Sequence, residues 1–140
     1  MVTEGIIDAS TIVSLVVPEE YSEWASAAVS RYSYLRTLEL ACHEVTNAIC
    51  SKVLKKELSE EDASKALKDA LELIDSMETH IARHLITESF NIALEADISA
   101  YDASYIALAK KQHSKLITLD KKLAKKLNGT TYSSFLEYPK

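Results

Sequence analysis

The sequence is short of the residues that mark several protein classes. Its 140 residues include two glycines, two prolines and two cysteines. So little Gly and Pro predicts tight connections and argues against a low-complexity linker. No apolar run approaches the roughly 20 residues of a membrane-spanning helix, and no charged-then-apolar signal peptide opens the chain. We therefore expect one domain over residues 1–140, soluble and cytoplasmic, with no membrane contact.

Disulfide and zinc chemistry also lack support. Cys42 and Cys50 share an expected helix, where eight residues at 1.5 Å each separate them by roughly 12 Å, too far for a disulfide. The sequence has no Cys-x-x-Cys and no His-Glu-x-x-His motif. His80 and His84 fall in a stretch that alternates like a strand, where a spacing of four does not bring them together. We expect both histidines to be structural.

The charge is unevenly distributed. A net charge of −5 argues against a protein whose whole surface binds nucleic acid. Residues 103–140 nevertheless hold eight lysines against two acids, whereas residues 1–102 hold 19 acids against eight basic residues. This asymmetry fits either a local basic surface beside an acidic body or a solvated helix face of lysines.

Hydrophobic periodicity predicts strands that alternate with helices. The expected strands are a first one that ends at Asp8, then 34–38, 79–85, 115–120 and an edge strand at 130–132. The expected helices are 10–17, 19–31, 39–56, 59–77, 87–96, 99–113 and 121–127. Such alternation implies parallel pairing through right-handed crossovers, hence a three-layer α/β/α sandwich.

Four acids occupy comparable positions in this pattern. Asp8 and Asp120 close strands, and Glu44 and Asp102 lie in the first turns of helices. In a doubly wound sheet, ligands bind beyond the carboxyl ends of the strands, and all four positions can reach that crevice. We call Asp8, Glu44, Asp102 and Asp120 the four acids.

Each of the four acids also has a local explanation. Asp8 and Asp120 would cap the helices that follow them. Asp102 would complete a Ser-x-x-Asp capping box with Ser99. Glu44 would be a residue at the rim of the core, paired with a lysine. Taken one at a time these alternatives are adequate, but four coincidences in one chain favour a shared site.

Convergence of the four acids has a chemical consequence. Two carboxylates about 4 Å apart repel by about 4 kcal/mol at an effective dielectric constant near 20, so the group needs protons or cations. Mg²⁺ or Mn²⁺ suits a site that offers only oxygen ligands. One or two such ions can activate water and stabilise both oxygens of a phosphodiester displacement. The sequence therefore leads to the hypothesis of a nuclease.

Four segments resemble, in order, the acidic motifs of PIN domains. They are residues 6–10 (Ile-Ile-Asp-Ala-Ser), 44–48 (Glu-Val-Thr-Asn-Ala), 101–109 (Tyr-Asp-Ala-Ser-Tyr-Ile-Ala-Leu-Ala) and 116–120 (Leu-Ile-Thr-Leu-Asp). The third and fourth are most similar to VapC-type toxins of bacterial and archaeal toxin–antitoxin pairs. The resemblance spans essentially the whole chain.

The resemblance implies a five-stranded parallel sheet flanked by helices, endoribonuclease activity, a homodimer and inhibition by a VapB-type antitoxin. It implies that Asp8, Glu44, Asp102 and Asp120 are the catalytic ligands of one or two Mg²⁺ or Mn²⁺ ions. Ser10 and Thr118 would orient these carboxylates by hydrogen bonds.

Two lysines complete the expected site. Lys121 and Lys122 follow Asp120 directly, and a carboxylate cluster needs local cations if a polyanion is to approach it. We therefore expect both lysines to contact the RNA backbone.

Several alternatives compete with this hypothesis. A HAD-type phosphotransferase needs a second Asp where Ser10 stands, and a phosphorelay receiver needs an acidic pair where Asp8 stands alone. A PIN fold that serves as a binding or scaffolding module with slow or absent catalysis would retain the same residues. So would a housekeeping RNA-processing nuclease.

Overall fold

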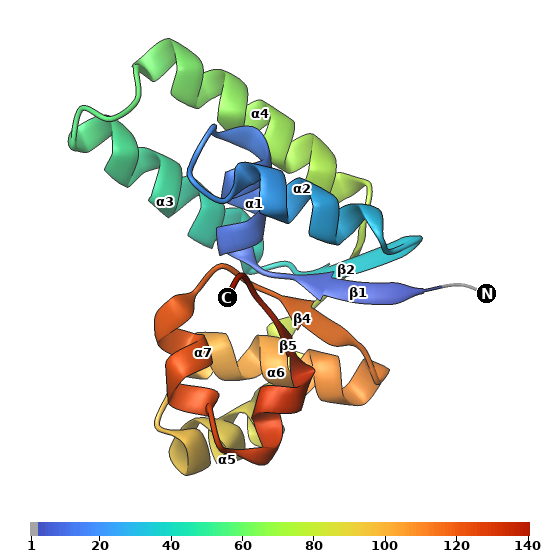
Figure 1. Ribbon diagram of the computed structural model, residues 1–140. Helices are drawn as coiled ribbons and strands as arrows, with labels where there is room; N and C mark the ends of the chain where they lie inside the picture. Colours follow the sequence, from blue (N-terminus) through green and yellow to red (C-terminus); the bar gives the residue numbers. More distant parts are fainter. Residues whose placement is uncertain (1–2) are drawn as a thin grey trace.

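The computed structural model describes residues 3–140, which form a five-stranded, entirely parallel sheet between two layers of helices (Figure 1). The strand order is β3-β2-β1-β4-β5. The strands are β1 (Glu4–Ile7), β2 (Tyr34–Leu38), β3 (Glu78–His80), β4 (Lys115–Ile117) and β5 (Leu136–Glu137). The predicted three-layer sandwich is confirmed.

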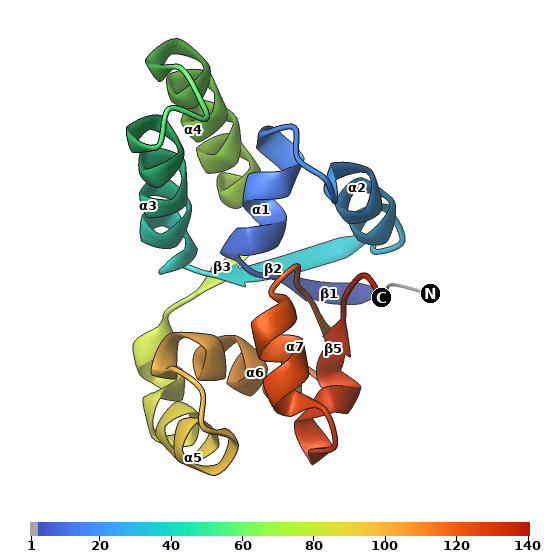
Figure 2. The same cartoon turned by 60° about the vertical axis from the view of Figure 1, so that its left-hand side comes forward.

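The first and second halves of the chain cover opposite faces of the sheet (Figures 1 and 2). One face carries α1 (Ala9–Val16), α2 (Ser22–Ser30), α3 (Ala41–Leu54) and α4 (Glu60–Asp75). The other carries α5 (Ile86–Ala96), α6 (Ala100–Gln112) and α7 (Lys121–Leu127). The chain changes direction across the sheet between β1 and β4, which are neighbours. Ligands of doubly wound folds bind at such a switch point.

The central strand β1 is apolar because both of its faces are covered. Ile6 and Ile7 are fully buried, and because strand side chains alternate they enter different cores. Ile6 packs in the core beneath α5 and α6, whereas Ile7 packs in the core beneath α1, α3 and α4. Leu116 and Ile117 of β4 repeat this division. The sheet therefore separates two cores and fixes the residue that follows each strand.

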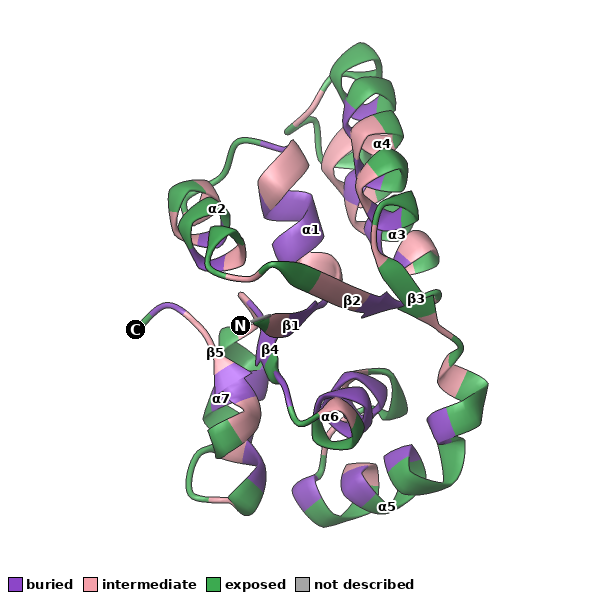
Figure 3. Cartoon of the chain, turned by 90° about the vertical axis from the view of Figure 1, so that its right-hand side faces the viewer, coloured by how far each residue is buried: buried purple, intermediate pink, exposed green. Residues whose placement is uncertain are grey.

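Helix α6 is the most enclosed helix. Its residues 103–109 are all buried (Figure 3), and a helix buried on every side lies inside the protein and not on its surface. Asp102 stands at the start of this buried run, so its position is fixed by the packing of the whole helix.

The predicted strand at 79–85 is wrong in its second half. Pairing between β2 and β3 ends at Leu38 and His80, because β2 gives way to α3. Beyond that point an edge strand has no partner, and the chain forms a 3₁₀ helix at Ala82–Leu85 that buries Leu85 in the core.

The predicted edge strand at 130–132 is also wrong. The Thr130 hydroxyl accepts a hydrogen bond from the Tyr132 amide at 3.2 Å and starts a 3₁₀ helix, Thr131–Phe135. Tyr132 is buried in the core, and its hydroxyl donates to Glu95 at 2.7 Å. The last strand, β5, therefore begins six residues later than expected, at Leu136.

Other sequence expectations hold. Cys42 and Cys50 both lie on α3 and both are free. Of the helices between residues 3 and 140, none combines the length and apolarity needed to cross a bilayer.

Gly5 lies under an aromatic ring. A Cβ at this position would approach Cδ1 of Tyr32 to 2.8 Å, and the Tyr32 hydroxyl is tethered to Glu137 at 2.6 Å. We expect Gly5→Ala to lower the free energy of unfolding by about 1–3 kcal/mol, the usual cost of overpacking, in urea denaturation. The cost should largely disappear in a Tyr32→Ala background. An equal cost in both backgrounds would contradict the steric explanation.

Candidate active site

Asp8 is the residue immediately beyond β1, and it is only 8% exposed. Its Oδ1 accepts a hydrogen bond from the Ser10 hydroxyl at 2.6 Å and another from the Thr11 amide at 3.1 Å. Its Oδ2 accepts a hydrogen bond from the Thr118 hydroxyl. These three donors, two local and one from beyond β4, hold the carboxylate in one orientation.

Ser10 and Thr118 link the ends of β1 and β4. Their hydroxyl oxygens are 3.4 Å apart. The Ser10 hydroxyl accepts a hydrogen bond from the Leu119 amide at 3.0 Å, and the Thr118 hydroxyl accepts one from the Asp120 amide at 3.1 Å. Both side chains therefore contact Asp8 and also fix the segment that delivers Asp120.

The capping alternatives are correct, and they are compatible with a shared site. Oδ1 of Asp8 accepts from the amide of Thr11, and Oδ1 of Asp120 accepts from the amide of Leu123 at 3.0 Å. The Asp102 amide donates to the Ser99 hydroxyl at 3.1 Å. Because a cap constrains the side chain that forms it, capping by Asp8 and Asp120 orients these carboxylates.

Glu44 has a partner that the sequence did not suggest. It lies half-buried in the first turn of α3, and its Oε1 accepts a hydrogen bond from the Tyr105 hydroxyl at 2.7 Å. Tyr105 is 2% exposed and lies on α6, three residues after Asp102. That spacing places both side chains on one face of the helix. It is the feature of the sequence that could have indicated Tyr105 as a neighbour of the four acids. Tyr105 thus connects α6 with Glu44 on the opposite helix layer.

The carboxyl groups respond to one another's charge. Burial raises the pKa of Asp8, and the negative charge of Asp120 raises it further. The hydrogen bonds that Asp8 accepts act in the opposite direction and lower its pKa. Burial and the charges of Asp8 and Asp102 raise the pKa of Glu44, against the Tyr105 hydrogen bond. Burial, then Asp120 and Asp8, raises the pKa of Asp102. The structure therefore brings the four acids into one electrostatic environment.

Basic side chains of the described residues do not neutralise the four acids through ion pairs. None of the ion pairs found in residues 3–140 includes any of the four acids. Within the same residues, no three His, Cys, Asp or Glu side chains lie close enough together to form a ready-made metal group. Mutual repulsion opposes closer approach of ionised carboxylates. Their oxygen-only donor set fits Mg²⁺ or Mn²⁺, and not zinc.

Sequence comparison identifies the fold family. The sequence profile described as "PIN domain" matches residues 6–127, a range that contains all four acids. The chain belongs to the PIN domain family. Ribonuclease VapC3 of Pyrobaculum aerophilum is 40% identical over 121 residues, which cover 86% of this chain and 92% of that protein. Ribonuclease VapC1 of Mycobacterium tuberculosis is 33% identical over 86% of this chain and 89% of its own length. The chain is thus a PIN protein of the VapC type.

Solved structures agree with this assignment. The crystal structure of PAE2754 from Pyrobaculum aerophilum superposes with a TM-score of 0.67 at 26% identity, covering 91% of this chain and 81% of that one. A toxin–antitoxin complex from Klebsiella pneumoniae superposes with a TM-score of 0.68 over 95% of both chains. At 13% identity the second match concerns the fold alone.

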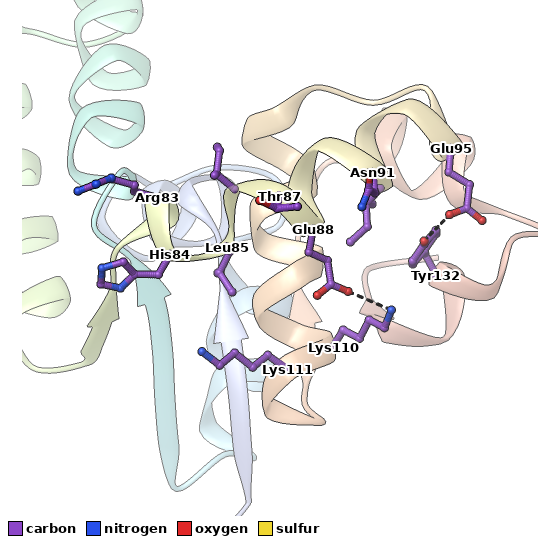
Figure 4. Close-up of a pocket in the computed structure, with 12 residues that line it drawn as sticks. Arg83, His84, Leu85, Thr87, Glu88, Asn91, Glu95, Lys110, Lys111 and Tyr132 are labelled. Atoms are coloured by element: carbon purple, nitrogen blue, oxygen red, sulfur yellow. Dashed lines mark hydrogen bonds and ion pairs between the residues drawn. The ribbon is translucent and has the colours of Figure 1, made fainter.

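A hollow of about 650 Å³ lies away from the four acids, between α5, α6 and Tyr132 (Figure 4). Two contacts between side chains cross its lining: Lys110 pairs with Glu88 at 3.0 Å, and Tyr132 donates to Glu95 at 2.7 Å. None of the four acids lines it. This hollow is therefore separate from the candidate active site of the PIN domain.

The raised pKa values predict a pH-dependent stability. The pKa of Asp102 is higher in the folded protein than in the unfolded protein. Between these two pKa values the folded protein binds more protons than the unfolded one, so the free energy of unfolding falls as the pH rises. In chelator-treated buffer, we expect Asp102→Asn to raise the Tm above wild type by a few degrees at pH 7.5. The difference should shrink as the pH is lowered through the range above 3.8, the ordinary pKa of an aspartate, because folded Asp102 becomes protonated there. Asp69→Asn, which removes an acid of α4 that pairs with Lys65, is the control. A Tm difference independent of pH would contradict the prediction.

Proposed function

We propose that this PIN domain is a divalent-metal-dependent endoribonuclease and the toxin of a VapBC-type pair, active in the cytoplasm. The observation that carries the proposal is the electrostatic coupling of the four acids at the switch point of a PIN fold. The chain is 40% identical to a protein named Ribonuclease VapC3, and folds of this kind bind ligands at the edge of the sheet beyond the carboxyl ends of its strands.

In this proposal the four acids are the catalytic residues and hold one or two Mg²⁺ or Mn²⁺ ions. When bound, such a cation neutralises phosphate charge and makes a water more acidic. Asp8 is the anchor, because Ser10 and Thr118 fix its carboxylate. Both hydroxyls stand behind the carboxylate as orienting groups, the arrangement that metal ligands usually require.

The chain's own residues also account for substrate approach. Lys121 and Lys122 open α7 immediately after Asp120, and both are exposed. The Lys121 ammonium donates to the Tyr21 hydroxyl and lies 4.7 Å from the Tyr21 ring centroid. This contact holds one cation close to the segment that carries Asp120. We propose that both lysines bind the RNA backbone, since phosphate contacts supply most nonspecific affinity.

A partner protein completes the proposal. One structural neighbour was solved as a toxin–antitoxin complex, and we propose a VapB-type antitoxin as the inhibitor of this chain. The names of the relatives favour a toxin over a housekeeping RNA-processing nuclease. The presence of all four acids favours an active enzyme over a scaffolding module.

We also propose that the protein is a homodimer that pairs through α5. Ile86, Phe90 and Leu94 are 53%, 60% and 69% exposed, and a spacing of four places them on one helix face. Thr87 and Asn91 border this face without adding charge. A two-fold pairing juxtaposes a surface with itself, so an uncharged face suits a chain whose net charge is −5 better than a charged one would.

Activity tests the enzyme directly. With Mg²⁺ or Mn²⁺, we expect wild type to cleave single-stranded RNA and chelator to abolish cleavage. Asp8→Asn should lower the rate at least about 100-fold, the scale of losing one preorganised electrostatic group. Thr118→Val, which removes only an orienting hydroxyl, should cost about 10- to 100-fold.

The control for these variants is Asp69→Asn, an acid of α4 that pairs with Lys65. It should cleave RNA at the wild-type rate. Equal activity of wild type, Asp8→Asn and chelator-treated protein would exclude the mechanism. Binding of Mn²⁺ without any cleavage would select the scaffolding module instead.

The molecular mass of the protein in solution tests the proposed dimer. We expect wild type to run as a dimer in size-exclusion chromatography with light scattering, and Phe90→Ser to run as a monomer, because it removes the centre of the α5 face. Leu54→Ser is the matched control, since Leu54 is 79% exposed at the end of α3. A monomeric wild type, or a dimeric Phe90→Ser, would overturn the assignment of α5.

A further inference from the structure

A cavity of about 450 Å³ adjoins the four acids on the side of α1, and we call it the Tyr21 cavity. Three of its lining residues come from the segments that position the acids. Ser10 binds Asp8, Ala48 lies one turn after Glu44 on α3, and Leu119 precedes Asp120. None of the four acids lines the cavity itself, but it shares Ser10 with the hydrogen bonds that hold Asp8 and therefore lies next to the candidate active site.

The walls of the Tyr21 cavity suit a flat, uncharged group. Val13, Ala48 and Leu119 supply apolar surface, and Tyr21 supplies an aromatic side chain. Glu19 and Glu20 also line it. Glu19 is held by Lys52 at 2.6 Å and by the Ser14 hydroxyl at 3.1 Å. Two carboxylates at the wall disfavour a phosphate inside the cavity, because like charges repel in a partly desolvated space.

A cation stands beside the same wall. Lys121 donates to the Tyr21 hydroxyl and lies over the Tyr21 ring. The arrangement thus offers an apolar, aromatic hollow for one part of a ligand and a fixed positive charge next to it for another. Single-stranded RNA has this division, since its bases stack on aromatic side chains whereas its phosphates bind cations.

We propose that the Tyr21 cavity binds one unstacked base of the RNA, close to the bond that is cut, and so contributes to the choice of cleavage position. The proposal rests on the ribonuclease function argued above. It assigns to Tyr21, Ala48 and Leu119 a role in base binding that is distinct from the role of the four acids.

The test uses a short single-stranded oligoribonucleotide that the wild-type protein cleaves at one bond. A series of versions each lacks the base at one position. We expect the loss of one particular base, near the cut, to raise KM about tenfold, the scale of a lost base-stacking contact. Loss of the other bases should change KM less.

The variants locate this effect in the cavity. Ala48→Leu fills the hollow and Tyr21→Ala removes its aromatic wall, so each should raise KM for the intact oligonucleotide about tenfold. In both, the sensitive abasic substitution should change KM less than twofold. Ala27→Leu, the same enlargement on the exposed face of α2, should retain wild-type KM and its abasic sensitivity. The Tm of each variant verifies folding, and Tyr21→Ala decides the matter if Ala48→Leu does not fold.

The possible failures are distinguishable. Absence of RNA cleavage by wild type with any divalent cation would overturn the ribonuclease function and the base site together. Cleavage with the same abasic penalty in wild type, Ala48→Leu and Tyr21→Ala would overturn the base site alone. So would an intact-RNA KM that neither variant changes, an outcome that would leave the cavity to a side chain of a protein partner.

Discussion

The structure depends on how a buried carboxylate is kept at the meeting point of β1 and β4. Desolvation raises the pKa of Asp8 and so opposes its charged form, whereas hydrogen bonds from Ser10, Thr11 and Thr118 support that form. Two of these donors, Ser10 and Thr118, also accept hydrogen bonds from the backbone amides of Leu119 and Asp120. The contacts that make burial of one acid tolerable are therefore the contacts that position a second acid.

Helix capping and the shared site have a common structural origin in this fold. A residue just beyond a parallel strand precedes a helix, so the position that caps the helix is also the position that faces the ligand crevice. Asp8 and Asp120 cap α1 and α7, and both stand at the position from which the proposed site is built. The capping explanation of each residue taken alone was therefore correct but incomplete. The recurrence of acids after strands and in first turns of helices is what indicated a shared site.

Much of the fold was predictable because its signals are local. The strand at 34–38 and the helix at 121–127 match the structure to the residue, and the two apolar strands that end near acids define the central pair. The strand at 79–85 and the edge strand at 130–132 were misplaced because their limits depend on partners. β3 stops where β2 leaves the sheet, and the register of β5 depends on Tyr132 entering the core.

The sequence indicated the four acids as a group, which stays a prediction of a site, but it did not indicate the contact of Tyr105 with Glu44. The sequence context of Tyr105 is an alanine-rich helix, in which a tyrosine reads as core, and its hydroxyl contact with Glu44 crosses between opposite helix layers. Contacts of that kind are set by the way two layers meet at the sheet edge. The spacing of apolar residues within one helix carries no information about contacts between the two helix layers.

Placing the two halves of the chain on opposite faces of the sheet has a consequence for synthesis. Asp8, the first of the four acids to emerge from the ribosome, is held by Thr118, which lies 110 residues later in the chain. A nascent polypeptide with α1 to α4 already folded still lacks that hydroxyl and two of the acids. The complete set of four acids, with the Thr118 hydroxyl that holds Asp8, can therefore assemble only after residue 120 has been added to the chain.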